Sequence, residues 1–597
     1  MSASSTTATP SSVSTAHSRW FSLTAWAALA GLLIANLPLM ACMPLTADPV
    51  LYDLQARTAL EGGVLYRDIV EPNLPGIVWV HMAVRTLFGW SSVALRLFDI
   101  VVVTGIVALL AGWVHRQPSR GVPPRPGPAR PGSALKTATV PIVALLLFWF
   151  YFSLSEWTHC QRDVWLMLPA LCAAWLRWRQ TLRLSLEPRA NRQAAFAWGV
   201  LEGVLWAAAF WIKPFVALPA LAAIIVSALL TRRWRLVAAD GLGVLGGGLI
   251  VGGLGSAWLL ETGAWPHFWE MALEWNPAYF AAGRERWSLE RYLSLQERFY
   301  PWSLVHLIAV PLALLNLLRV RPGFSEDRVS GHDDARNPVS QKIPGFCETA
   351  RAALLSALYL GWVFEAHCLQ HLFDYAHVPG TMLGVALAAL HWPRRPETRR
   401  FAGLCLAAGV VVAALTSPAT QPRRLAWWPV CLTEGSTYEV RAALQIVPVP
   451  NWNDLEPVIA FLEKQDPADG ELTAYNVFLI HLYPELELRP STRYAFLNIL
   501  IIVFKDRSET IQAALEQSRQ RFVVSSLIED GMSARDLDAV DPADPPRLPP
   551  AFPRERLSQF PYNQRLVFRS GQYVVHEIVN PVGPLCTDSF PLDGDAR

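Results

Sequence analysis

Charged residues are scarce in this chain of 597 residues: 17% are Asp, Glu, Lys or Arg, whereas 52% are hydrophobic. Soluble domains carry about 25% charged residues, so the deficit excludes an ordinary soluble protein. The positive charge lies in short blocks between long apolar runs, as in a multi-pass membrane protein. A net charge of +2 gives no indication of a nucleic-acid partner.

Motifs of several common sites are also missing. The eight cysteines form no C-x-x-C pair, which argues against the usual zinc and redox sites. There is no P-loop, no G-x-S-x-G, and no G-x-G-x-x-G that opens a helix after a strand, so a cytoplasmic nucleotide site has no support. Cys431 and Cys586 would form a disulfide in an extracytoplasmic domain; the alternative is two unrelated thiols.

Long apolar runs are abundant, and a membrane span needs about 20 apolar residues. Eleven runs are candidates: 20–42, 93–114, 137–155, 164–178, 195–212, 214–231, 236–260, 301–319, 349–366, 374–391 and 401–417. The shorter segment Ile77 to Phe88 contains His81 and Arg85. We interpret it as a surface or re-entrant helix, because the basic loops then all fall on the cytoplasmic side.

The predicted fold is therefore an α-helical polytopic membrane protein of the inner or plasma membrane, with about eleven transmembrane helices plus a surface helix. Residues 1–19 are expected to be a disordered cytoplasmic N-terminus, and 20–417 the transmembrane domain with an outer acidic loop, 43–92. Residues 418–597 are expected to form a small extracytoplasmic α/β domain with a Pro-rich loop and a flexible tail. Its predicted helices are Asp454 to Lys464 and Ser508 to Ser518, and its predicted strands are 521–526 and 572–578.

Two outer turns carry acids that are candidates for chemistry. Asp48 follows the first run and is either a general base or the N-cap of a helix from Pro49 to Leu60. Asp163 follows Arg162 at the next outer turn and is either a second functional carboxylate or half of a simple Arg–Asp pair. Together Asp48 and Asp163 form a candidate site for a divalent metal ion. Asp53, one turn beyond Asp48, is expected to matter less.

Two further polar groups lie between apolar runs. Lys213 is expected near the outer surface, where it either binds an anionic phosphate or merely extends to water. Tyr375 and His377 lie in a polar, aromatic segment, 370–379. That segment is either a sugar or phosphate site or part of an aromatic belt. The spacing of its histidines is not that of a zinc site.

Taken together, these residues resemble a family pattern. The matching positions are Asp48, Tyr52, Gly62-Gly63, Tyr66-Arg67-Asp68 and Pro75-Gly76, then Gln161-Arg162-Asp163, and finally Phe373-x-Tyr375-x-His377-x-x-Pro379. In order and topology they resemble the polytopic glycosyltransferases of the GT-C fold, including bacterial aminoarabinose transferases and protein mannosyltransferases. The similarity covers residues 20–417.

The resemblance implies an inverting transfer from a polyprenyl-phosphate sugar to a lipid, glycan or protein acceptor on the outer face. Asp48 would be the base. The donor would be bound by Tyr52, Tyr66, Asp68, Arg162, Asp163, Lys213, Tyr375 and His377. No cofactor is certain, although some relatives hold a metal at positions like Asp48 and Asp163.

The chain departs from the family pattern in two places. The usual Asp-Glu pair is Asp48-Pro49, and Asn73-Leu74-Pro75-Gly76 lacks the lysine that meets the donor phosphate in the family. Lys213 or Arg162 is a candidate replacement. A transporter or flippase of lipid-linked sugars and a catalytically inactive membrane scaffold are the alternative functions.

Overall fold

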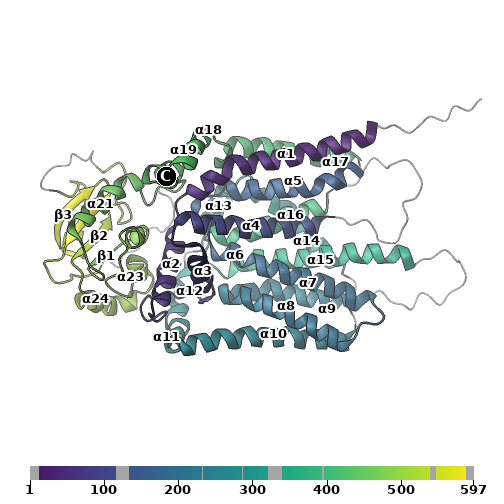
Figure 1. The fold of residues 1–597 in the computed structure, drawn as a ribbon, viewed down its shortest axis with the longest axis horizontal. Helices are drawn as coiled ribbons and strands as arrows, with labels where there is room; N and C mark the ends of the chain where they lie inside the picture. Colours follow the sequence, from purple (N-terminus) through teal and green to yellow (C-terminus); the bar gives the residue numbers. More distant parts are fainter. Residues whose placement is uncertain are drawn as a thin grey trace, which may run out of the picture.

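The computed structural model describes residues 13–115, 133–231, 233–285, 287–320, 339–392, 396–537 and 546–585. A bundle of long helices carries a small sheet-containing domain at one end (Figure 1). The long helices are α1 (Val13–Cys42), α4 (Ser92–Val114), α5 (Ser133–Phe152), α7 (Met167–Leu186), α8 (Arg192–Ile212), α9 (Ala217–Thr231), α10 (Trp234–Glu261), α14 (Val305–Leu318), α15 (Val339–Cys368), α16 (Asp374–Leu390) and α17 (Pro396–Thr416).

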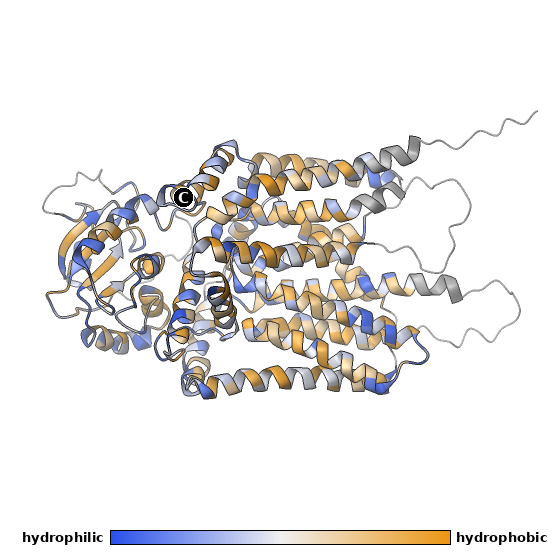
Figure 2. Ribbon diagram, viewed as in Figure 1, coloured by the Kyte–Doolittle hydropathy of each residue, from blue (hydrophilic) through white to orange (hydrophobic). Residues whose placement is uncertain are grey.

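The bundle is that of a multi-pass membrane protein. Apolar residues dominate along its length, whereas polar residues concentrate at its ends and in the small domain (Figure 2). Each of the eleven predicted runs corresponds to one of these helices. Six of the described helices are long and apolar enough to cross a membrane, or up to seven if a bent pair counts as one span, so the count of eleven is not confirmed. The first helix begins at Val13, and residues 1–12 of the expected disordered segment lie outside the described residues.

Shorter helices gather at the end of the bundle that carries the small domain (Figure 1). They are α2 (Ala47–Leu60), α3 (Gly76–Phe88), η1 (Glu156–Thr158), α6 (Arg162–Trp165), η2 (Pro214–Val216), α11 (Trp265–Glu270), the π-helical η3 (Met271–Trp275), α12 (Asn276–Glu285), α13 (Leu289–Arg298) and η4 (Trp302–Leu304). The helix expected at 77–88 is α3. It is fixed to α2 because Asp53 accepts hydrogen bonds from His81 at 2.8 Å and Arg85 at 2.7 Å.

The C-terminal domain has an α/β fold around a sheet of order β1-β2-β4-β3, in which β1 and β2 are parallel and the other pairs antiparallel. Its strands are β1 (Leu472–Ala474), β2 (Phe522–Ser526), β3 (Arg565–Ser570) and β4 (Tyr573–Glu577). Its helices are α18 (Pro422–Leu425), α19 (Trp428–Thr433), α20 (Tyr438–Leu444), α21 (Trp452–Gln465), η7 (Val477–His481), α22 (Leu482–Glu485), α23 (Leu497–Val503), η8 (Lys505–Arg507), α24 (Ser508–Glu516) and η9 (Arg554–Ser558). Both predicted helices and both predicted strands are present, whereas β1 and β3 were not predicted.

Polar contacts hold this domain on the bundle. Glu156 of η1 accepts the backbone N–H groups of Ile446 at 3.1 Å and Val447 at 2.9 Å. Arg493 donates to the carbonyl oxygen of Tyr66 at 2.9 Å. Burial raises the pKa of Glu156, which the two backbone donors partly offset. The domain is therefore anchored directly against the acidic loop and the turn at 156–163.

Candidate functional site

Asp48 lies in the first turn of α2 and does not cap it. The N-cap residue is Thr46, without a side-chain cap hydrogen bond, so the N-cap alternative for Asp48 is wrong. The Asp48 carboxylate instead accepts a hydrogen bond from Gln161 Nε2 at 3.3 Å. Within the described part of the chain, no Lys, Arg or His lies at ion-pair distance from it. Burial raises the pKa of Asp48, and the nearby Arg162 opposes that shift.

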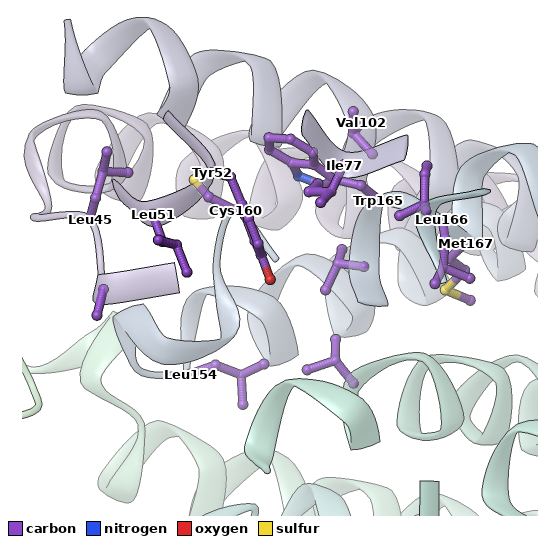
Figure 3. Close-up of a cluster of buried hydrophobic side chains, with 14 of the residues drawn as sticks. Leu45, Leu51, Tyr52, Ile77, Val102, Leu154, Cys160, Trp165, Leu166 and Met167 are labelled. Atoms are coloured by element: carbon purple, nitrogen blue, oxygen red, sulfur yellow. The ribbon is translucent and has the colours of Figure 1, made fainter. Parts of the chain in front are cut away.

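Apolar packing positions this part of α2. Tyr52, one turn after Asp48, is buried in a cluster with Leu51, Cys160 and Trp165 (Figure 3). Trp165 itself donates to Asp99 at 2.7 Å, which fixes the second outer turn against α4. Because interiors are close-packed, both turns hold their functional side chains in one arrangement.

Arg162 is a buried cation that holds unused hydrogen-bonding capacity. Its exposed fraction is 6%, and it pairs with Asp163 only at 3.9 Å. Its Nε has no hydrogen-bond partner among the described residues. Three tyrosines lie within electrostatic reach of it, namely Tyr52, Tyr279 and Tyr375. A guanidinium in this state is suited to a ligand anion, since guanidinium fits phosphate and carboxylate geometry.

Glu71 is a second carboxyl group close to Asp48. It is buried and bonded by Asn73. Burial raises its pKa to about 8, with Arg162 and Asn73 opposing the shift and Asp48 adding to it. At neutral pH this group is therefore largely protonated.

Asp163 is neutralised by a direct ion pair. Lys213 Nζ lies 2.6 Å from its Oδ1, and the two side chains are 4% and 2% exposed. Lys213 also donates to Gln370 and lies 5.7 Å from the centre of the Tyr375 ring. The structure thus brings Asp163, Lys213 and Tyr375 together.

Gly76 of the acidic loop explains how Lys213 comes close to Asp163 and Tyr375. A Cβ on Gly76 would lie 2.3 Å from the backbone carbon of Trp211 and 2.6 Å from the nitrogen of Ile212. Only glycine therefore lets α3 begin against the last residues of α8, next to Lys213. This contact gives the Pro75-Gly76 motif a steric reason.

Tyr66 and Asp68 shape the acidic loop itself. Tyr66 has a φ of 69°, and its hydroxyl donates to the carbonyl oxygen of Asn73 at 2.8 Å. Asp68 accepts the backbone N–H of Val64 at 2.7 Å and pairs with Arg67. These contacts fix the turn that leads to Glu71, so both residues act on the site through the loop.

His377 lies in another environment. Its ring contacts His367, with ring centres 4.6 Å apart, and its Nε2 has no hydrogen-bond partner among the described residues. Its ring also lies 6.5 Å from the ring of Phe299, and it is within electrostatic reach of Lys213.

The carboxylates do not fit a resident metal ion. Among the described residues, no three His, Cys, Asp or Glu side chains are grouped so that they could hold one. The Oδ1 of Asp163 contacts Lys213, so a metal ion bound there would lie next to the Lys213 ammonium group. We therefore derive no step through a metal at Asp48 and Asp163.

No protein-family model matches the chain, and no curated protein sequence matches it. A solved structure does: ArnT from Cupriavidus metallidurans, bound to undecaprenyl phosphate, with a TM-score of 0.50 and 14% sequence identity. The match covers 96% of this chain and 99% of that chain. The chain has the fold of ArnT. This confirms the GT-C-like fold expected from the resemblance, including the C-terminal domain.

Sequence reasoning missed several residues that this ArnT-like fold brings to the site. Glu71 was visible as an acid of the outer loop, and Glu365 was visible as an acid inside an apolar run, where ionisable residues are costly. Glu365 is 2% exposed and lies near Lys213. Tyr279 gave no signal, because it lies in a loop of many aromatic residues and reaches Arg162 only through the fold.

Proposed function

We propose that the chain is an integral membrane glycosyltransferase that moves a sugar from a polyprenyl-phosphate donor to an acceptor on the outer face of the membrane. The ArnT fold supports the class, and the solved ArnT structure is bound to undecaprenyl phosphate. In this proposal the C-terminal domain is extracytoplasmic and the membrane is the inner or plasma membrane.

The observation that carries the proposal is the state of Asp48. Its carboxylate is held by a neutral amide, Gln161, at 3.3 Å, and it is free of a direct cation partner among the described residues. A carboxylate of this kind, whose pKa is raised by burial, is a suitable general base near neutral pH. Asp48 takes the proton of the acceptor hydroxyl as that oxygen attacks the anomeric carbon.

Arg162 stabilises the negative charge that develops on the phosphate as it leaves the sugar. As the new carbon–oxygen bond forms, the bond from the anomeric carbon to the phosphate oxygen breaks, and its electron pair moves to the polyprenyl phosphate. The attack comes from the opposite side, so the anomeric centre inverts. The Nε of Arg162 has no hydrogen-bond partner among the described residues, whereas Lys213 already pairs with Asp163 at 2.6 Å. Arg162 is therefore the better replacement for the lysine missing from the acidic loop.

Glu71 and the tyrosines complete the site. Glu71, with a pKa of about 8, is neutral below that pH and so does not repel the donor phosphate. Tyr52, Tyr279 and Tyr375 surround Arg162 and supply hydroxyl groups and ring faces for a sugar. Lipid, glycan and protein hydroxyls remain equivalent acceptors in this scheme.

The test is transfer by purified protein from a radiolabelled polyprenyl-phosphate sugar to a membrane extract. An enzyme gives labelled acceptor in wild type and much less in Asp48→Asn. A transporter moves the intact donor across the vesicle membrane without cleaving it, at equal rates in wild type and in Asp48→Asn. A scaffold does neither, and that result would refute the proposal.

The orientation has its own test. Cysteines placed singly near Arg125 and in the C-terminal domain are treated, in intact cells, with a reagent that cannot cross the membrane. The domain should be labelled and the position near Arg125 should be protected. Labelling near Arg125 would reverse the proposed orientation.

A further inference from the structure

Two cysteines that are far apart in the sequence meet where the chain leaves the bundle for the C-terminal domain. Cys42 is the last residue of α1, and Cys431 lies in α19. They are separated by 389 residues, yet the Cys42 thiol donates to the carbonyl oxygen of Cys431 at 3.4 Å. Their exposed fractions are 4% and 6%, within one small apolar cluster with Leu39, Val440 and Leu444.

The backbone on both sides of this contact is fixed by hydrogen bonds. Trp428 donates to the carbonyl oxygen of Ile34 at 2.8 Å, and Ser436 donates to the carbonyl oxygen of Cys42 at 2.9 Å. The two thiols also share a side-chain hydrogen bond, which is the main reason that the pKa of Cys431 is raised. With the Cys42 sulfur 3.4 Å from the backbone carbonyl oxygen of Cys431, the two cysteines are close neighbours, as a disulfide requires.

We infer that Cys42 and Cys431 are joined by a disulfide in the mature protein. The inference rests on the proposed function in one respect, because it needs this end of the bundle to face the extracytoplasmic space, where disulfides persist. Each thiol loses one proton, and the two sulfurs together give two electrons to a protein disulfide of the thiol–disulfide exchange class. That partner is reduced to two thiols as the Cys42–Cys431 bond forms.

The cross-link fastens the connection between the bundle and the domain. The segment that follows Cys431 leads through α20 to Ile446 and Val447, whose N–H groups hold Glu156. The disulfide therefore ties the outer end of α1 to the chain just before this anchor. It takes the place of the predicted pair between Cys431 and Cys586; Cys586 lies outside the described residues.

Peptide mass spectrometry of the protein from its native membrane tests this. Cells are quenched with acid, free thiols are blocked with N-ethylmaleimide, and the protein is digested without a reductant. We expect a linked pair of peptides containing Cys42 and Cys431, lighter than their sum by two hydrogens and lost on reduction. The link should persist in Cys586→Ser, while Cys431 should become alkylated in Cys42→Ser. A link from Cys431 to Cys586, or alkylation of both Cys42 and Cys431 in wild type, would overturn the inference.

A second measurement separates a wrong contact from a wrong orientation. Purified, reduced wild-type protein is incubated with oxidised glutathione and digested in the same way. If neither this protein nor the cellular protein is cross-linked, the contact itself is wrong. If only the purified protein is cross-linked, the native disulfide and the outer orientation are both overturned. Sugar transfer by folded Cys42→Ser protein should stay at the wild-type rate, so the glycosyltransferase proposal is judged separately.

Discussion

Asp48 and Asp163 are the two outer carboxylates that the sequence marks as candidates, and the structure gives them opposite surroundings. Asp48 is bonded by the neutral amide of Gln161 and faces Arg162 without touching it. Asp163 contacts Lys213 Nζ at 2.6 Å, with both side chains almost fully buried. Asp48 has no direct cation partner among the described residues, whereas Asp163 has its Oδ1 on Lys213 and its Oδ2 without a hydrogen-bond partner there.

In the proposed mechanism, the cation next to each carboxylate decides its role more than its place in the chain does. Burial raises the pKa of Asp48, with Arg162 and Gln161 opposing the shift, and a raised pKa makes a carboxylate a stronger base. We therefore assign proton transfer to Asp48 and the positioning of Lys213 to Asp163.

The largest effect is expected from Asp48→Asn. An asparagine there keeps the contact with Gln161 but cannot accept the acceptor's proton, and losing general-base help costs typically about 10²–10⁴-fold in rate. Thermal stability in detergent should not change, since Asp48 does not cap α2. Transfer rates and donor binding are measured on the same folded preparation. If Asp48→Asn transferred sugar at the wild-type rate, the general base would have to be another residue.

Asp53→Asn is not a neutral control for that experiment. Asp53 is buried and accepts hydrogen bonds from His81 and Arg85, so its substitution weakens the contact between α2 and α3. Glu61→Gln is a better control, because Glu61 is an exposed acid just beyond the end of α2, where it pairs with Arg489 at the surface. It should leave both stability and transfer close to wild type.

Asp163→Asn should act on stability first. It leaves the Lys213 ammonium buried without its direct counter-ion, and breaking a buried pair in this way costs about 3–5 kcal/mol. Glu365, close to Lys213, reduces that cost. The double variant Asp163→Asn, Lys213→Met should recover much of the stability without recovering transfer. Thermal unfolding in detergent checks both variants, and an unchanged melting temperature in Asp163→Asn would show that the pair is dispensable.

These contrasts also show what the sequence was able to predict. The length of the apolar runs predicted a helix at each of the eleven. The distribution of basic loops indicated that 77–88 lies at one end of the bundle. The ion pair between Asp163 and Lys213 could not be predicted, because nothing in a sequence fixes which cation a carboxylate contacts across 50 residues. The strand β1, with three residues, was too short to show a period.

The pH dependence of transfer should report on Glu71. Its pKa rises from 4.5 to about 8 in the folded protein, so its stabilising contribution is complete below pH 4.5 and is lost as the pH rises through about 8. Ionised Glu71 would add a second negative charge beside Asp48 and repel the donor phosphate. We expect wild-type transfer to fall above about pH 8, and Glu71→Gln to remove that fall. If transfer by Glu71→Gln fell in the same way at alkaline pH, another group would be responsible for the fall.

The smallest effect is expected from Asp68→Asn, although the family resemblance gives Asp68 a role in donor binding. Its carboxylate accepts the backbone N–H of Val64 at 2.7 Å, a bond that an asparagine oxygen retains. Its pair with Arg67 is partly exposed, and such surface pairs contribute only about 0–1 kcal/mol. Transfer and melting temperature should therefore stay near wild type in the assays used for Asp48→Asn. A large loss of transfer at unchanged stability would indicate that Asp68 contacts the donor. The comparison between Asp48 and Asp163 would then have to include Asp68 as a third carboxylate.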